Sequence, residues 1–206
     1  MPTQRIYGDA CTIARALDVV GERWALLIVR ELLFGPQRYS DLRHALPGAS
    51  SNLIADRLRE LDANGVVLRR RLPPPAASWV YELTARGRRL EPVLYALGAF
   101  GSDVPVPRDA YLSATSALLY LRQSARPEHR WPVTVCGIQL EDQPFTVRSK
   151  QGRIEVRRGE PEQAVARLRT TPWGLMELIS DPSRLSDADV AGDPGVFQRL
   201  FATIAG

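Results

Sequence analysis

The stretch SSNLIADRLRELDANGVVLRRRL, residues 50–72, constrains the fold of this chain more than any other segment. Its apolar residues recur at steps of four and three, which predicts one buried stripe on a short helix: Ile54, Leu58 and Leu61. Ser50 or Ser51 is the expected N-cap, and Asn64-Gly65 is typical of a left-handed helix end. Because three arginines follow at once, the helix is expected to lead directly into a basic extended segment.

Helices are also expected upstream of that stretch. Residues 10–34 repeat apolar side chains at helical steps, and Gly21 is expected to divide them into two helices that end at Gly35-Pro36. Residues 39–46 predict a further short helix with Ser40 as its N-cap. A tight connection, PGA, then leads into the stretch described above.

A β-hairpin is expected downstream, because VVLRRRLPPPAASWVYELT alternates as a pair of strands does. Arg69 and Arg71 are expected on one face of the first strand and Arg70 on the other. The three prolines at 73–75 cannot donate to a strand ladder, so they belong at the hairpin tip or at an edge. Thr84 is the expected cap of a last helix, which Pro92, inside it, is expected to kink. The apolar seam of this helix is Leu90, Val93, Leu94, Leu97 and Phe100.

This order of helices and hairpin predicts a winged helix, in which the short helix enters the major groove of DNA and the hairpin is the wing. Residues 1–101 carry 14 basic against 10 acidic residues, whereas residues 102–206 carry 13 of each, so the excess of positive charge lies in the first half. Small polar residues at a helix N-terminus can approach bases and phosphates, and arginines neutralise phosphates. The candidate DNA contacts are Arg38, Ser40, Ser50, Ser51, Asn52, Ala55, Arg57, Arg59, Arg69, Arg70 and Arg71.

Several spaced motifs across residues 8–101 resemble the HxlR-type winged-helix transcriptional regulators. They are the Cys before the first helix, GERW, RELLFG, RYSDL, LRELDANG and YELTARG, in that order. The resemblance implies a homodimer, built from the first and last helices of this domain, that binds operator DNA. The sequence departs from the family at Asn52, where relatives usually carry a basic residue, and at Asp56, an acid on the expected DNA face.

The second half predicts a separate α+β domain with an antiparallel sheet, residues 110–206, after a linker at residues 102–109. Residues 108–125 form an apolar-rich helix, three short strands follow, and two helices lie near the C-terminus. AVARLRTTP is compatible with a helix or a strand, and its alternation favours a strand.

The strand run and the closing GD…FQRLF resemble the sterol carrier protein-2-like (SCP2-like) fold, which implies an apolar tunnel for hydrophobic molecules. The candidate ligand-binding residues are Phe145, Trp173, Met176, Phe197, Leu200 and Phe201. Each of these side chains is also compatible with an ordinary core position.

Cys11 is the redox candidate, because a thiol at a helix N-terminus is favoured as the thiolate. The alternative is a small apolar residue buried at the dimer interface. His44 and His129 have no cysteine or carboxylate at ligand spacing, so no metal site is expected. No nucleotide-binding or catalytic motif is found, and neither an enzyme nor a cofactor is expected.

The sequence therefore predicts a DNA-binding regulator that binds an inverted repeat as a homodimer and responds to an apolar small molecule in the second domain. Two cysteines and the lack of a long apolar run predict a cytoplasmic location without a membrane span. Two alternatives are a regulator switched by oxidation at Cys11 and a lipid carrier with little DNA binding.

Overall fold

A computed structural model of the chain describes residues 6–125, 133–150, 153–202 and 204. The chain divides into two compact units, Met1–Pro105 and Val106–Gly206. No helix in the described part of the chain combines the length and the hydropathy that a bilayer span requires. Each unit has its own hydrophobic core, and each is described separately below.

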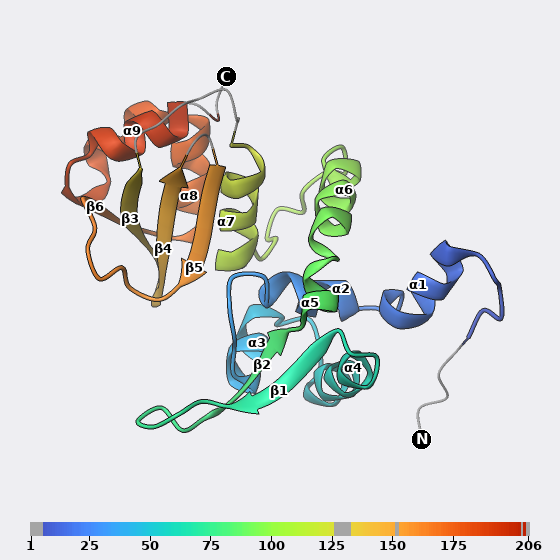
Figure 1. The fold of residues 1–206 in the computed structure, drawn as a ribbon. Helices are drawn as coiled ribbons and strands as arrows, with labels where there is room; N and C mark the ends of the chain where they lie inside the picture. The colour runs from blue at the N-terminus through green and yellow to red at the C-terminus, as the bar shows by residue number, and fades with distance from the viewer. Residues whose placement is uncertain (1–5, 126–132, 151–152, 203, 205–206) are drawn as a thin grey trace. The chain divides into compact units, whose positions relative to one another are not determined.

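Unit 1 is a helical bundle with a two-stranded hairpin (Figure 1). Its elements are α1 (Thr12–Val20), α2 (Ala25–Glu31), α3 (Tyr39–Ala45), α4 (Ser51–Ala63), β1 (Val67–Arg71), β2 (Trp79–Leu83), α5 (Ala85–Arg88) and α6 (Glu91–Gly101). The predicted break at Gly21 and the left-handed stop at Gly65, with φ +66°, are confirmed. The largest fully buried side chains of this unit come from α2, its C-cap Leu32, α3 and α4: Ile28, Leu32, Leu42, Ile54, Leu58 and Leu61.

Two details of the helix predictions in unit 1 were wrong. Arg38, not Ser40, is the N-cap of α3, and the Asp41 carboxylate accepts a hydrogen bond from the Arg38 backbone N–H at 2.9 Å. The last helix is not kinked but divided, because α5 ends at Arg88 and α6 begins just before Pro92. A proline in the first turn lacks only an N–H that would have no helical partner, so a helix can start there without losing a backbone hydrogen bond.

The turn that leads from the hairpin into α5 is held by close backbone packing. The Thr84 hydroxyl donates to the Gly65 carbonyl at 2.7 Å and accepts from the Gly87 N–H at 3.1 Å. A Cβ on Gly87 would lie 2.1 Å from the Val66 carbonyl oxygen. Only glycine therefore lets α5 lie against the connection between α4 and β1, and this fixes the base of the hairpin.

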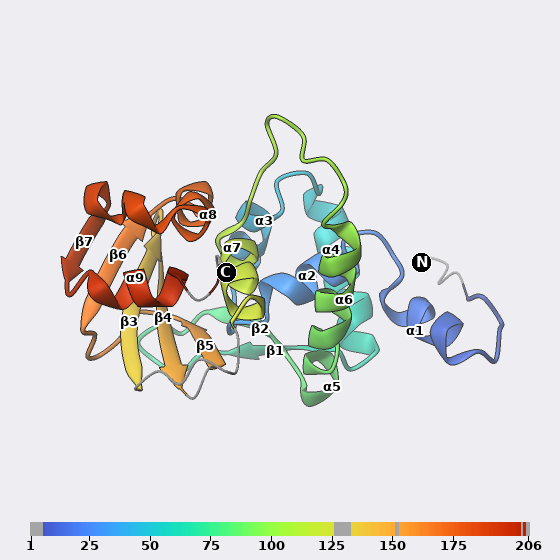
Figure 2. The same ribbon diagram turned by 90° about the horizontal axis from the view of Figure 1, so that it is seen from above.

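Unit 2 is a five-stranded sheet with helices against one side of it. Figures 1 and 2 show α7 and α8 gathered on one side of the strands. The strand order is β5-β4-β3-β6-β7. Its elements are α7 (Ala114–Gln123), β3 (Thr134–Leu140), β4 (Gln143–Lys150), β5 (Arg153–Arg158), β6 (Ala166–Thr170), α8 (Pro172–Ser180), a 3-10 helix (Pro182–Asp187), β7 (Asp189–Gly192) and α9 (Gly195–Ala202).

The α+β class and the strand at β6 are confirmed, but the prediction of an antiparallel sheet was wrong. Strands β3 and β6 pair in parallel, with Ile138 opposite Leu168, while the other neighbours are antiparallel. A fifth strand, β7, was not predicted, because its four residues include an aspartate, an alanine and a glycine, which carry little strand signal. The helix predicted over residues 108–125 begins only after Ser113, whose hydroxyl caps it by accepting from the Ser116 N–H at 3.1 Å.

Candidate nucleic-acid interface

The N-terminus of α4 presents small polar residues to solvent. Ser50 caps it, with its Oγ 3.4 Å from the Leu53 backbone N, while Ser51 and Asn52 are exposed. The Tyr39 hydroxyl donates to the Ser51 carbonyl at 2.6 Å, which fixes this end of α4 against α3. Exposed Ser and Asn side chains beside free backbone N–H groups form a surface that can accept a phosphate or a base edge.

The two arginines of α4 are held by carboxylates. The Arg57 side chain is only 12% exposed and lies 2.5 Å from Glu60 and 3.5 Å from Glu22. Arg59 is 75% exposed but pairs with Asp56, one turn earlier on the same helix. The structure therefore makes Arg57 a link between α4 and the α1–α2 connection, and not a free cation on the DNA face. Ala55, between these pairs, is half-buried.

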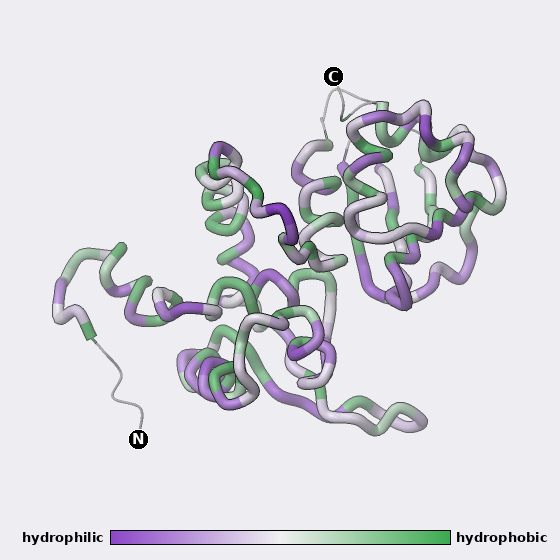
Figure 3. Tube along the Cα trace, turned by 180° about the vertical axis from the view of Figure 1, so that it is seen from behind, coloured by the Kyte–Doolittle hydropathy of each residue, from purple (hydrophilic) through white to green (hydrophobic). Residues whose placement is uncertain are grey.

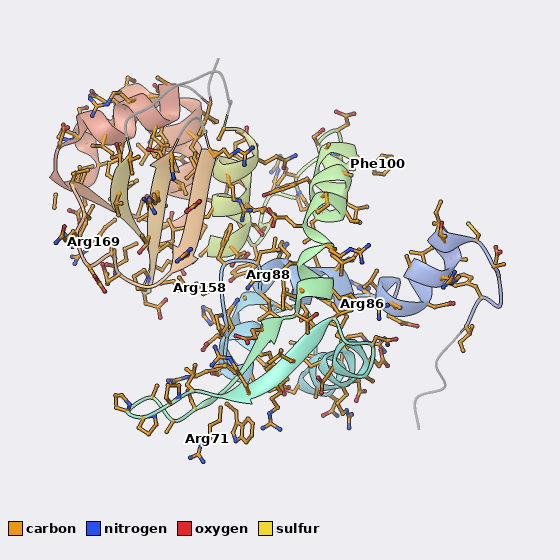
Figure 4. All side chains as sticks on the ribbon, in the orientation of Figure 1. Arg71, Arg86, Arg88, Phe100, Arg158 and Arg169 are labelled. Carbon is orange, nitrogen blue, oxygen red and sulfur yellow. The ribbon has the colours of Figure 1, made fainter. Side chains whose placement is uncertain are left out.

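The hairpin arranges its three arginines as the alternation predicts. Arg69 and Arg71 are exposed, and Arg71 points away from the hairpin into solvent (Figure 4). Its Nε donates to the Ala77 carbonyl at 3.1 Å, which leaves the terminal nitrogens of the guanidinium for a partner. Arg70 lies on the other face and pairs with Glu82 at 2.8 Å. The hydrogen bond to Glu82 raises the pKa of Arg70 above its ordinary value.

Sequence reasoning missed the aromatic partner of the hairpin. Trp79 is 52% exposed and lies directly opposite Arg71 in the strand register. The Arg69 guanidinium lies over the Trp79 ring, 4.5 Å from its centroid, and 6.0 Å from that of Tyr81. A cation held over an aromatic face keeps its charge exposed and loses conformational freedom. The sequence did contain a signal for this partner, a tryptophan that follows a serine near the hairpin tip. A hairpin tip has no hydrophobic core into which a tryptophan could pack.

Two further candidates lie near the start of α3. Arg38 is exposed, and its Nε donates to the Ser78 hydroxyl at 3.2 Å, so α3 and the hairpin tip are joined. The Ser40 hydroxyl donates to Asp41 at 3.1 Å and is exposed. The structure thus brings the α3 start and the hairpin together, and a DNA backbone that contacts one of them can contact the other.

Cys11 is the N-cap of α1 and is exposed in the single chain. The backbone N–H groups of Ala14 and Ile13 hold the pKa of its thiol below the ordinary value. Burial raises the pKa of the other thiol, Cys136, to about 12. The two cysteines therefore differ in reactivity, and only Cys11 has the surroundings that favour a thiolate.

The first and last helices of unit 1 expose apolar side chains in the single chain. Figure 3 shows hydrophobic segments recurring along α6, and Phe100 points into solvent (Figure 4). Phe100 is 82% exposed and Ile13 is 69% exposed. The exposed members of the two helices are Ile13, Leu17, Val93, Leu97 and Phe100. Leu94 of the seam predicted for the last helix is buried instead, as is Val20 of α1.

The candidate ligand-binding residues of unit 2 fall into two groups. Phe145, Phe197, Leu200 and Phe201 are buried, and the rings of Phe197 and Phe201 lie 6.0 Å apart between centroids. Trp173 is instead partly exposed, with its indole N–H donating to the Ala110 carbonyl at 3.1 Å, and Met176 is half-buried. The hollow lined by Leu200, Val196 and Cys136 encloses about 30 Å³, which is room for a water molecule.

No group of three or more metal-ligating side chains occurs in the described residues. His44 is exposed on α3. His129, the other histidine considered above, lies outside the described residues. Unit 1 places polar residues at a helix N-terminus beside a hairpin of exposed arginines. These side chains are of the kinds that can bind phosphates and base edges.

Comparisons with known proteins find helix-turn-helix regulators of transcription. A family model described as HxlR-like helix-turn-helix matches residues 19–108. The uncharacterized HTH-type transcriptional regulator sll1512 of Synechocystis is 40% identical over 96 residues, which are 47% of this chain and 71% of that protein. The uncharacterized HTH-type transcriptional regulator Mb3122 of Mycobacterium bovis is 32% identical over 135 residues, 65% of this chain and 79% of that protein. The solved structure of reduced YodB, a transcriptional regulator of Bacillus subtilis, is 31% identical and covers 49% of this chain and 100% of that one, with a TM-score of 0.42.

Proposed function

The chain belongs to the family of HxlR-like helix-turn-helix transcriptional regulators, and from this premise we propose that it binds an inverted-repeat operator as a two-fold homodimer. In this proposal α4 enters the major groove with Ser50, Ser51 and Asn52 toward the bases, and β1–β2 is the wing that contacts phosphates. The observation that carries the proposal is the pair of exposed wing arginines, Arg69 and Arg71, which have no ion pair among the described residues.

The first experiment is selection of bound sequences from a random duplex library, followed by affinity measurements on the enriched sequence. We expect two related half-sites in inverted orientation, about 10 base pairs apart, because a two-fold protein reads two successive turns of one groove. Enrichment of a sequence without internal symmetry would contradict the dimer, and no salt-sensitive duplex binding at all would contradict the DNA-binding role.

The homodimer is supported by the exposed apolar faces of α1 and α6. Five large apolar side chains in water on two short helices are more than a monomer surface normally leaves uncovered. We expect a dimer in sedimentation at micromolar concentration and a monomer for Leu97→Asp, which would place a charge in the interface. Tyr120→Asp, another exposed side chain but on α7, is the matched control and should sediment as the unmodified chain does.

For unit 2 we propose an SCP2-like domain that binds an apolar effector. The order of its elements and three fully buried phenylalanines, Phe145, Phe197 and Phe201, support this assignment. Because the hollow beside Leu200 holds only about 30 Å³, such a ligand would have to move core side chains in order to enter. A thermal-shift screen of fatty acids, sterols and aromatic metabolites tests this, and stabilisation by none of them would make unit 2 a structural brace.

A second candidate function is redox or electrophile sensing through Cys11. It is favoured by the exposure of this thiol and by the two N–H groups that lower its pKa. A lowered pKa raises the thiolate fraction near neutral pH, so an alkylating reagent should modify Cys11 well before Cys136. Oxidant treatment should then change DNA affinity in the unmodified chain and not in Cys11→Ser, and an equal response of both would reject the sensor.

A further inference from the structure

One face of the unit 2 sheet is not covered by the helices of that unit. Along β4, β5 and β6, buried side chains alternate with exposed ones, so one face of each strand meets the helices and the other meets solvent. Six basic residues lie on the second face, at the exposed positions of the alternation. We call this surface the arginine face: Arg148, Lys150, Arg153, Arg157, Arg167 and Arg169. Arg158 is not a member of this face, because it donates to Thr115 of α7 at 2.6 Å. Figure 4 shows Arg169 and Arg158 toward opposite edges of the sheet.

The second half of the chain has no net charge, but its positive and negative residues are unevenly distributed. Three acidic residues accompany the six cations of the arginine face, namely Glu155, Glu160 and Asp189. Residues 102–206 contain 13 basic and 13 acidic residues, so the remainder of this half has seven basic against ten acidic ones. The arginine face is therefore an island of positive charge on a part of the chain that is otherwise acidic.

The cations of this face have few partners inside the protein. Arg167 lies 3.9 Å from Glu160, at the limit of an ion pair. The other five cations make no ion pair and no side-chain hydrogen bond among the described residues: Arg148, Lys150, Arg153, Arg157 and Arg169. Lys150 and Arg153 stand directly opposite each other in the β4–β5 register. Like charges at opposed positions destabilise a strand pair, so this arrangement is not explained by folding.

The centre of the face is shaped as well as charged. Gly137 of β3 has no side chain there, and a Cβ would lie 3.2 Å from Cγ of Arg167. A hollow of about 250 Å³ lies over this glycine, and its polar lining is Gln139, Glu160, Arg167 and Arg169. The absence of a bulky apolar side chain at this place leaves a polar depression in which two arginines outnumber one carboxylate, so a phosphate group can be held there by the arginines.

We infer that the arginine face binds the phosphate backbone of the double-stranded DNA that unit 1 holds, outside the bases that α4 reads. The inference rests on the proposed function, because unit 1 brings the DNA. The segment between α6 and α7, residues 102–113, spans at most roughly 40 Å when fully extended. This short connection keeps unit 2 as a whole at a high effective concentration relative to a DNA that unit 1 holds, so a weak cationic surface suffices to engage that DNA.

The test compares two double variants of the full chain with equal changes of charge. Arg153→Gln/Arg157→Gln removes two unpaired cations of the arginine face. Arg184→Gln/Arg199→Gln removes two cations of the same unit that pair with Glu177 at 2.7 Å and Asp193 at 3.5 Å. Affinity for a mixed-sequence duplex of about 40 base pairs is measured against salt concentration, and thermal unfolding is measured for both.

We expect the arginine-face variant to lower the salt slope by about two units and to weaken binding at least tenfold at about 0.1 M salt, while the control changes affinity less than about twofold. Its thermal stability should be equal to or above that of the unmodified chain, because Arg153 no longer opposes Lys150. Shortening the duplex to about 20 base pairs should reduce the difference between the two variants, since outer phosphates are then absent.

The outcomes separate this inference from the proposed function. If Arg69→Gln/Arg71→Gln weakens binding but Arg153→Gln/Arg157→Gln leaves the salt slope unchanged, the arginine face does not bind DNA and an acidic protein surface becomes its partner by charge. If the unmodified chain shows no salt-sensitive binding to any duplex, the proposed function and this inference both fail.

Discussion

The recognition helix α4 and the wing each carry exposed or half-exposed arginines, and they hold them in opposite ways. On α4, Arg57 and Arg59 each lie against a carboxylate, and Arg57 is nearly buried. On the wing, Arg69 lies over an aromatic ring and Arg71 bonds only to a backbone carbonyl. The number of arginines near a DNA-binding helix therefore overstates the positive charge that is available to DNA.

The same distinction operates within the wing. Arg70 lies between Arg69 and Arg71 in sequence, but it faces the other side of the strand and pairs with Glu82. Three consecutive arginines therefore divide into two that can neutralise phosphates and one that stabilises the hairpin. Paired cations are expected to contribute to folding, and unpaired ones to DNA affinity.

The largest expected effect is on stability, from Arg57→Ala. This change leaves Glu60 without its partner at 2.5 Å and breaks the link to Glu22, so we expect the free energy of unfolding to fall by about 2–3 kcal/mol. Denaturant titration measures it. Arg59→Ala, at a pair far more exposed, is the control and should lose less than about 0.5 kcal/mol. Equal losses would mean that burial does not separate the two arginines.

A smaller effect is expected from Trp79→Ala, and it should be on DNA binding. Loss of the ring frees Arg69 to adopt many conformations, and a cation–π contact of about 0.5–1 kcal/mol corresponds to a two- to fivefold weaker affinity. Fluorescence anisotropy with a labelled duplex measures this. Trp79→Phe keeps an aromatic face and should retain most of the affinity. If both variants bind as the unmodified chain does, the stack has no part in DNA recognition.

The smallest expected effect has the opposite sign. Asp56 pairs with Arg59 on the exposed side of α4, so Asp56→Asn should release that arginine and remove a negative charge near the DNA. We expect duplex affinity to rise about twofold at low salt and the gain to vanish at high salt. A weaker affinity after this change would show that Asp56 is needed to hold Arg59 in place for a DNA contact.

Much of unit 1 follows from local sequence signals. The stripe of α4, its cap at Ser50 and its stop at Gly65 depend on residues within one helix, as does the alternation of the wing arginines. Of the two Arg57 partners, Glu60 lies three residues along the same helix, but Glu22 could not be predicted in this way, because it is distant in sequence and comes near only when the helices pack.

Unit 2 was predicted less well, for a related reason. Local patterns found β6 but could not say that it pairs in parallel with β3, since pairing depends on where the connection between them crosses the sheet. The exposed position of Trp173 was missed because an aromatic residue on an apolar helix usually packs inside, whereas here its N–H bonds to the chain before α7.

A comparison of Arg70→Gln with Arg71→Gln in the full chain tests whether the cations without a protein carboxylate are the ones that bind DNA. The two residues are neighbours on one strand and carry the same charge, and only Arg70 is paired, with Glu82 at 2.8 Å. The measurement is the dependence of duplex affinity on salt concentration. We predict that Arg71→Gln lowers the slope by about one unit and that Arg70→Gln leaves it unchanged. Equal slopes for the two variants would contradict this prediction.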